Sequence, residues 1–189
     1  MTSHVAAGKL QGLKEDAYWY EAAFVAGITN AINVVADSMA LPDGSSFMEP
    51  VSESDASGKL SAVFADIRAF YQVPEVPRVF RIMAREPGYL ADFWAATRRT
   101  FSDNQLSRRL KEALAFAVSL TTRSGFGTAF HLEQMRKLGV GERGVMEILG
   151  MTQMFSSYTK IADVLQLEAD MGDMAPPDLS PAPGGKMRS

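Results

Sequence analysis

The sequence predicts an all-α protein, and two observations lead to that class. Apolar residues recur at three- and four-residue spacing through several segments, as on one face of a helix. No segment shows the alternation of apolar and polar residues that is typical of a strand. Groups of proline, glycine and serine, which favour turns, separate the helical segments, and no internal repeat is visible.

The length and composition predict one domain with extensions. With 189 residues, of which 47% are apolar, the chain can bury one sizeable core. We expect this core over residues 57–168, preceded by a helical extension and loop over residues 1–56. Residues 169–189 are rich in proline and glycine, which predicts a flexible tail that buries little apolar surface.

The first half of the chain is expected to contain four helices. The longest covers residues 13–39 and ends at a Leu-Pro-Asp-Gly turn. Ser57 can cap a helix over residues 59–71. A step marked by prolines then leads into helices over residues 78–85 and 87–100, because proline is tolerated in the first turn of a helix.

Three further helices are predicted in the second half. Ser102 or Asp103 can cap a helix over residues 104–121. A glycine-containing break separates it from a helix over residues 128–137, and a second glycine pair precedes the last helix, over residues 142–167.

Two of these helices carry an apolar stripe, which in an amphipathic helix faces the core. The stripe of the 104–121 helix consists of Leu106, Leu110, Ala113, Leu114, Ala117 and Val118. The stripe of the 142–167 helix consists of Val145, Ile148, Leu149, Met151, Phe155, Tyr158, Ala162 and Leu165.

The charge of the chain excludes some partners. The formal net charge is -3 and the sequence pI is about 5.4, so no basic excess is present to neutralise phosphates. We expect no nucleic-acid partner and no membrane surface, and a small molecule or another protein instead. The first residues lack a basic flank followed by an apolar core, and no uncharged apolar run is long enough to span a bilayer. The expected location is therefore the cytoplasm.

Cysteine and histidine usage limits the chemistry further. The chain has no cysteine, which excludes a disulfide, a thiolate metal site and a peroxidatic thiol. It has two histidines and no cluster of Asp, Glu and His at ligand spacing. We therefore expect no bound metal ion and no cofactor.

His131 is the one histidine outside the extreme N-terminus, and histidine is the side chain best suited to proton transfer near neutrality. From the residue alone, a structural histidine and a catalytic one are both open. The turn before it contains Ser124, Gly125, Gly127 and Thr128, where backbone N–H groups at a helix start could bind a carboxylate or an oxyanion. The same glycines would also serve a tight helix connection, and nothing in the sequence places a base beside Ser124 to make it a nucleophile.

Residues 110–131 resemble the core of the alkylhydroperoxidase D-like (carboxymuconolactone decarboxylase) superfamily. In that family a glutamate on one helix is followed by a C-x-x-C-x-x-x-H motif at the start of the next. Glu112 and His131 match the glutamate and the histidine. Ser124 and Gly127 stand at the two cysteine positions, so the family's redox thiols are missing.

The resemblance extends on both sides of this motif. Upstream, residues 57–68 and 73–90 are similar to the entry helices of the family and their proline-marked step. Downstream, residues 155–165 are similar to its F-N-x-Y-N-R-x-A-D segment, although both asparagines are replaced. Tyr158 is the tyrosine of that segment and a further candidate for substrate binding.

This resemblance implies an alkylhydroperoxidase D-like helical bundle with an added N-terminal helix and a flexible tail. It also implies a homo-oligomer, a trimer or hexamer, for which the apolar 13–39 helix would suit a subunit contact. Without thiols, peroxide reduction by a thiol cycle is not expected. The expected chemistry is cofactor-free acid/base catalysis by Glu112 and His131 on a small carboxylate or lactone, of a decarboxylase, isomerase or lyase type.

Other interpretations remain open at this point. Glu112 and His131 could form a hydrogen bond that only holds two helices together, in a catalytically degenerate binding or scaffold protein. A thiol-independent peroxidase is a further alternative. A fainter similarity of residues 63–94 to the repeat unit of the group I 2-haloacid dehalogenases suggests a hydrolase, although the aspartate of that family cannot be placed in this chain.

Overall fold

In the computed structural model, residues 16–40 and 45–166 are described, and this part of the chain consists of helices joined by turns and loops. The elements, in chain order, are α2 (Asp16–Met39), the 3-10 helix η1 (Glu53–Asp55), α3 (Gly58–Tyr71), α4 (Arg78–Met83), α5 (Pro87–Phe101), α6 (Arg108–Thr121), α7 (Gly125–Lys137) and α8 (Glu142–Leu165). One isolated backbone bridge joins Ala40 and Ser46, so no sheet forms within the described residues. The predicted all-α class is confirmed.

The predicted tail over residues 169–189 and the first residues of the predicted 13–39 helix lie outside the described residues. The division of the chain at residues 56 and 168 stays a prediction.

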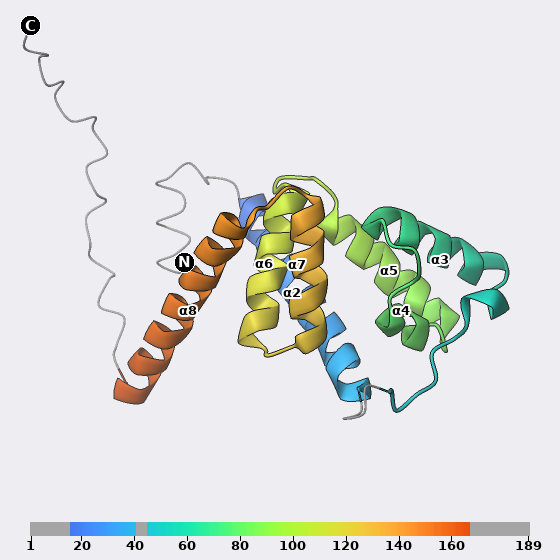
Figure 1. Ribbon diagram of the computed structural model, residues 1–189, viewed down its shortest axis with the longest axis horizontal. Helices are drawn as coiled ribbons and strands as arrows, with labels where there is room; N and C mark the ends of the chain where they lie inside the picture. Colours follow the sequence, from blue (N-terminus) through green and yellow to red (C-terminus); the bar gives the residue numbers. More distant parts are fainter. Residues whose placement is uncertain (1–15, 41–44, 167–189) are drawn as a thin grey trace, which may run out of the picture.

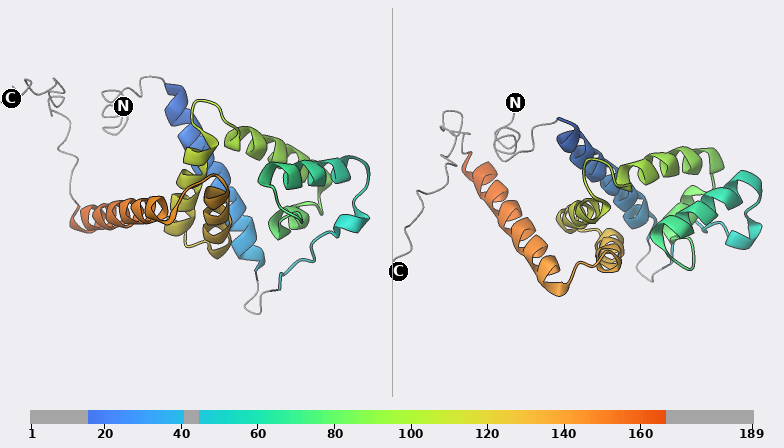
Figure 2. Two further views of the ribbon diagram at one scale, coloured as in Figure 1. Left: turned by 45° about the horizontal axis from the view of Figure 1, so that its top comes forward. Right: turned by 90° about the horizontal axis from the view of Figure 1, so that it is seen from above.

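Three helices, α2, α6 and α7, pack together at the centre of the fold. In Figure 1, α6 and α7 form an antiparallel hairpin, α2 crosses behind it, and α3, α4 and α5 lie together on one side. α8 leaves the hairpin at an angle and extends away from the other helices, which both views of Figure 2 show. The first part of α8 packs against the hairpin.

Aromatic side chains join the α3–α4–α5 group to the hairpin. Phe64 and Tyr71 of α3 are buried in one cluster with Phe80 and Trp94. The Tyr71 ring centroid lies 5.6 Å from that of Trp94 and 4.8 Å from that of Phe130 on α7. Because each aromatic side chain removes a large apolar area from water, this cluster is a main source of stability between the two groups of helices.

The contact of α2 with the hairpin is close and polar. Asn33 of α2 is buried, and its Nδ2 donates to Ser119 Oγ at 3.1 Å and to Thr122 Oγ1 at 3.3 Å. Gly127 of α7 faces the same group, and a Cβ there would overlap with Asn33 Oδ1 and Ser119 Oγ. The lack of a side chain at residue 127 therefore allows α2, α6 and α7 to approach one another.

α2 is a helix whose length and composition would also suit a membrane span, with a mean hydropathy of 1.3. The core helix of a helical domain meets the same criteria. α2 has features of such a core helix, because Asn33 hydrogen-bonds to α6 and because Val25 and Ile32 are buried among other helices.

The start of α6 differs from the prediction. α6 begins at Arg108 and not at residue 104, and its cap is Ser107, whose Oγ accepts the N–H of Leu110 at 3.3 Å. The predicted caps Ser102 and Asp103 are wrong. The helix starts later because backbone N–H groups of the preceding loop donate to a glutamate of α2, a contact that is distant in sequence.

The other helix ends are closer to the predictions. α7 begins at Gly125 and not at residue 128, because the capping bond of Ser124 draws the glycines into the first turn. Ser57 precedes α3 as predicted, although its side chain makes no capping bond. α4 ends at Met83, before the predicted residue 85.

The apolar stripe predicted on α6 does not face the core. The buried residues of α6 are Lys111, Glu112, Ala115, Phe116 and Ser119. Four residues of the predicted stripe, Leu110, Ala113, Leu114 and Ala117, instead line a groove between α6 and α8, whereas Leu106 is buried. Leu110 is 46% exposed. α6 therefore buries the polar and charged side chains of Lys111, Glu112 and Ser119 beside Ala115 and Phe116, and turns other apolar side chains toward the groove.

The stripe of α8 is also largely uncovered. Val145, Ile148 and Leu149, near its start, pack on a small cluster of α6 and α7. The exposed large apolar side chains of α8 are Met146, Met151, Met154, Phe155, Tyr158, Ile161, Val164 and Leu165. An apolar surface of this extent is typical of a contact site.

Gly127→Ala is expected to destabilise the fold, because the new Cβ would overlap with Asn33 and Ser119. Such overpacking costs about 1–3 kcal/mol. Gly125→Ala is the matched control, since a Cβ at residue 125 meets nothing within 4 Å in the same turn of α7. Urea unfolding followed by circular dichroism measures both variants. Equal unfolding midpoints for the two would contradict the close approach of the three helices.

Candidate active site

Glu112 of α6 and His131 of α7 meet inside the hairpin. The two helices run antiparallel on either side of the turn at Ser124, which brings these residues opposite each other. His131 Nδ1 lies 2.8 Å from Glu112 Oε2. The side chains are 1% and 0% exposed. The structure therefore brings together the two residues that the sequence pattern pairs.

Arg108, one turn before Glu112 on α6, is the third charged member of this group. Its Nε lies 3.5 Å from Glu112 Oε1, within ion-pair range but without hydrogen-bond geometry. Its terminal nitrogens donate to Phe70 O at 2.9 Å and to Gln134 Oε1 at 3.3 Å. The guanidinium also lies over the Phe70 ring, 4.1 Å from its centroid. This positive charge offsets part of the cost of burying the carboxylate.

Two phenyl rings enclose the imidazole of His131. Phe101, at the end of α5, stacks on it with ring centroids 5.7 Å apart. Phe130, on α7, meets it edge-on at 5.4 Å. The hydrogen bond to Glu112 thus lies in an apolar surrounding, where electrostatic interactions are stronger than in water.

Tyr71 is buried near the pair and has a raised pKa. Burial raises the pKa of its phenol well above the usual value, and the negative charge of Glu112 raises it further. Arg108 acts in the opposite direction but does not cancel these effects. Tyr71 therefore presents a neutral hydroxyl group at physiological pH.

Three buried polar atoms of this group have no hydrogen-bond partner among the described residues: His131 Nε2, Glu112 Oε1 and Tyr71 Oη. Buried polar atoms in proteins are nearly always paired, so these atoms retain hydrogen-bonding capacity. His131 Nε2 is the one suited to accept a proton, because Nδ1 of the same ring is engaged with the carboxylate.

The turn predicted to bind an anion is bonded in part to its own chain. Ser124 Oγ accepts the N–H of Gly127 at 3.0 Å and donates to Asp37 Oδ1 at 3.2 Å. The N–H of Thr128 donates to Ser124 O at 3.1 Å. Gly125 is the first residue of α7, and the space where its Cβ would lie is open. Of the amides at this helix start, those of Gly127 and Thr128 are therefore already engaged.

Tyr158 lies apart from the other predicted site residues. It is 60% exposed and belongs to α8, the helix that extends away from the hairpin (Figure 1). Within one chain the structure does not bring Tyr158 to Glu112 and His131.

Sequence reasoning missed three members of the buried group: Arg108, Gln134 and Tyr71. Arg108 precedes Glu112 by four residues and Gln134 follows His131 by three, so helical spacing could have identified both. Tyr71 lies on α3, far from the hairpin in sequence, and no pattern in the chain connects it to this group.

The described residues offer no cluster suited to a metal ion. No three His, Asp or Glu side chains among them lie close enough together to hold one. Glu112 and His131 instead form a hydrogen-bonded pair, whose geometry suits proton transfer.

Comparisons with known proteins agree with this arrangement. The model of the carboxymuconolactone decarboxylase family matches residues 87–170, a segment that begins with α5 and includes the α6–α7 hairpin. Among solved structures, the alkylhydroperoxidase AhpD core from Rhodospirillum rubrum is similar in fold, with a TM-score of 0.62 and 20% sequence identity over 67% of this chain and 95% of that chain. No curated protein matches the sequence. Residues 87–170 are thus similar to the carboxymuconolactone decarboxylase family, and the fold is similar to that of an alkylhydroperoxidase core.

This carboxymuconolactone decarboxylase-like domain has no cysteine. Ser124 and Gly127 stand at the two cysteine positions of the motif, where Ser124 caps α7 and Gly127 packs against α2. Peroxide reduction by thiols needs a reactive thiolate and a resolving thiol. Neither thiol is present in this chain.

Tyr71→Phe is expected to change the free energy of unfolding by less than about 1 kcal/mol near pH 7, because the hydroxyl that is removed has no partner. At high pH the two proteins should differ. The unfolded chain releases the phenol proton above about pH 10, whereas the raised pKa keeps it bound in the folded protein. The wild type therefore loses more stability than the variant as the pH rises above that value. Urea midpoints at neutral and alkaline pH measure this, and an equal loss in both proteins would contradict the shift.

Proposed function

We propose that this domain catalyses cofactor-free proton transfer on a small carboxylate or lactone, with His131 Nε2 as the atom that accepts the proton. The observation that carries the proposal is the buried Glu112–His131 hydrogen bond, which leaves Nε2 without a partner among the described residues. The similarity of residues 87–170 to the carboxymuconolactone decarboxylase family supports a reaction of the decarboxylase, isomerase or lyase type.

In this mechanism Glu112 orients the imidazole and balances its charge. A carboxylate only accepts hydrogen bonds, so the bond from Nδ1–H to Glu112 places the ring proton on Nδ1 and a lone pair on Nε2. When Nε2 takes a proton from the substrate, the imidazolium that results lies beside the carboxylate and is stabilised by it. The same Nε2–H then returns the proton to another atom of the substrate.

Ser124, Gly125, Gly127 and Thr128 are the proposed anion-binding turn for the substrate. The turn forms the N-terminus of α7, where the helix dipole favours a negative charge. His131 lies on the same helix, which supports a substrate that extends from the turn to the imidazole.

Access to the pair requires a movement of its aromatic cover. Phe101 and Phe130 contact the imidazole, so a substrate reaches Nε2 when one of these rings rotates away. A pair with a purely structural role has no need to open.

Glu112→Gln and His131→Ala are expected to lose proton-transfer activity. Small lactones and keto acids are incubated in D2O, and proton NMR follows deuterium entering the carbon next to the carbonyl group, an assay that does not require the complete reaction to be known. Each variant should slow this exchange by about 10²–10⁴-fold, the usual contribution of a positioned acid or base. Glu133→Gln is the control, since Glu133 is an exposed glutamate on α7, the helix that carries His131.

Exchange at the wild-type rate in both variants, with the helical fold retained, would leave the pair as a structural hydrogen bond in a binding or scaffold protein. Efficient reduction of an alkyl hydroperoxide by the purified protein with a dithiol donor would contradict the proposal that it is not a thiol peroxidase.

We also propose that the protein is a homo-oligomer, a trimer or hexamer, in which α8 packs against another copy. Met151, Met154, Tyr158, Ile161 and Leu165 follow one another at intervals of three and four residues, the spacing of a coiled-coil seam. All five side chains are exposed within one chain. An isolated helix is marginal in water, and its apolar seam needs a partner surface.

The groove between α6 and α8 supplies the surface for this partner. Leu110, Leu114 and Ala117 of α6 line it, with Met151 of α8 on the other side. The α8 seam of a second copy fits such an apolar groove, and the contact is then reciprocal between the two copies. In this assembly Tyr158 is covered by a neighbouring subunit, which keeps it a candidate binding residue.

Met154→Glu combined with Ile161→Glu is expected to convert the oligomer to monomers, because two charges in an apolar seam are costly to bury. Gln153→Glu with Lys160→Gln is the control. It changes the net charge by the same amount on a different face of α8 and should keep the oligomer. Sedimentation velocity measures the mass of each protein. A monomeric wild type would contradict the proposal.

A cytoplasmic location is also proposed. α2, which is apolar enough for a membrane span, is engaged with α6 and α7 within the fold. The net charge of -3 gives no attraction to anionic surfaces.

A further inference from the structure

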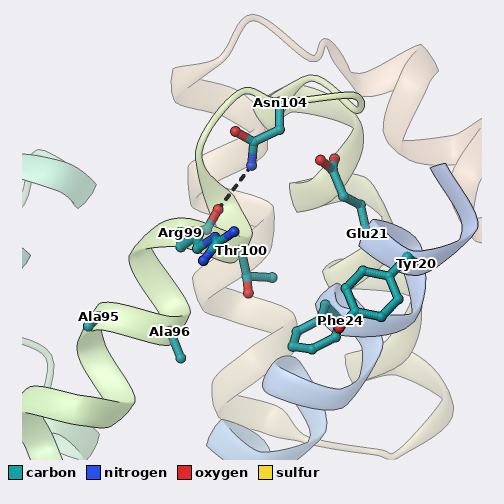
Figure 3. Close-up of a pocket in the computed structure, with 8 residues that line it drawn as sticks. All are labelled: Tyr20, Glu21, Phe24, Ala95, Ala96, Arg99, Thr100 and Asn104. Atoms are coloured by element: carbon teal, nitrogen blue, oxygen red, sulfur yellow. Dashed lines mark hydrogen bonds between the residues drawn. The ribbon is translucent and has the colours of Figure 1, made fainter. Parts of the chain in front are cut away.

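A cavity of about 560 Å³ lies between the start of α2 and the end of α5. Figure 3 shows Tyr20 and Phe24 of α2 facing Arg99 and Thr100 of α5 across it. Asn104, from the loop that follows α5, lies at one end. One wall is therefore aromatic and the other carries polar groups.

The aromatic wall is open to a ligand. The rings of Tyr20 and Phe24 have their centroids 4.6 Å apart, and the two residues are 66% and 45% exposed. Two alanines of α5 line the opposite side, so short side chains leave space between the helices. Small-molecule sites combine such apolar surfaces with a few polar groups that fix the orientation of the ligand.

The carboxylate in this cavity is already paired. Glu21 accepts the backbone N–H groups of Gln105 at 3.0 Å and Leu106 at 2.9 Å, and it lies 3.1 Å from Lys111 Nζ. Burial raises the pKa of Glu21, but these partners together hold it below its usual value. Glu21 therefore stays ionised with its charge balanced by Lys111.

Arg99 is the cation that the cavity leaves available. Its neighbour Arg98 is paired with Asp66, at 3.0 Å. For Arg99, the described part of the chain shows a bond from Asn104 to its backbone oxygen, at 3.2 Å, and no partner for its exposed guanidinium. A guanidinium beside an aromatic wall suits a ligand with a carboxylate at one end and an apolar body at the other.

We propose that this cavity binds a small carboxylic acid with an apolar body, of the aryl or branched alkyl type. Arg99 binds the carboxylate, and Tyr20 and Phe24 pack against the apolar body. The inference does not rest on the function proposed for Glu112 and His131, because neither residue lines the cavity.

Binding of 3-phenylpropionate to the full chain, measured by titration calorimetry at low salt, tests this site. The wild type is expected to bind the acid at least about tenfold more tightly than the uncharged 3-phenylpropionamide. Arg99→Gln should weaken binding of the acid by about tenfold or more, the effect of losing a charge-assisted hydrogen bond. Arg98→Gln is the matched control, since it removes the same charge from the next residue, whose partner is Asp66.

Four results would overturn the proposal: no binding of the acid by the wild type, equal affinity for acid and amide, equal weakening by the two arginine variants, or an altered oligomer mass in Arg99→Gln with unchanged affinity for the acid. His131→Ala separates this site from the proposed function. That variant should bind 3-phenylpropionate with the affinity of the wild type, whereas loss of binding would place the acid at His131 instead.

Discussion

The hydrogen bond between Glu112 and His131 is the interaction on which the arrangement of this domain depends. A carboxylate buried to 0% exposure is costly unless it is paired, and its neighbours in the hairpin supply a positive charge from Arg108 and a hydrogen bond from His131. His131 accounts for one oxygen and Arg108 lies beside the other, while Gln134 and a backbone carbonyl hold Arg108 in place. These polar contacts thus fix how α6 and α7 face each other, which apolar packing alone would not do.

This polar interior has a consequence on the opposite side of α6. Because Lys111 and Glu112 take inward positions beside Ala115 and Phe116, other apolar residues of the helix, Leu110 among them, line the groove shared with α8. α8 presents a second apolar seam to the same groove and is otherwise uncovered within the described residues. The charged centre of the hairpin and the uncovered apolar groove beside α8 are therefore related, because Lys111 and Glu112 occupy inward positions of α6.

Much of this fold was accessible from the sequence, since helical periodicity predicted every described α-helix and the motif predicted the pairing of Glu112 with His131. The start of α6 was not, because the loop before it is held by Glu21, whose contact lies 84 residues away in sequence. The direction of the α6 stripe was also misjudged, since hydrophobicity favours burial of Leu110 over Glu112, and the ion pair that reverses this order becomes visible only in three dimensions. Tyr71 joins the buried group through packing of α3, which no local pattern records.

The central claim is that the Glu112–His131 pair opens to small molecules and is more than a brace between helices. Carbethoxylation of the folded protein with diethyl pyrocarbonate, followed by mass spectrometry, tests this without knowledge of the substrate, and His4 in the same digest serves as the reference. If the pair opens, His131 is modified at Nε2 in the native protein, more slowly than His4. This modification occurs under conditions where circular dichroism shows no unfolding. Modification of His4 alone, with His131 protected until the protein unfolds, would contradict this claim.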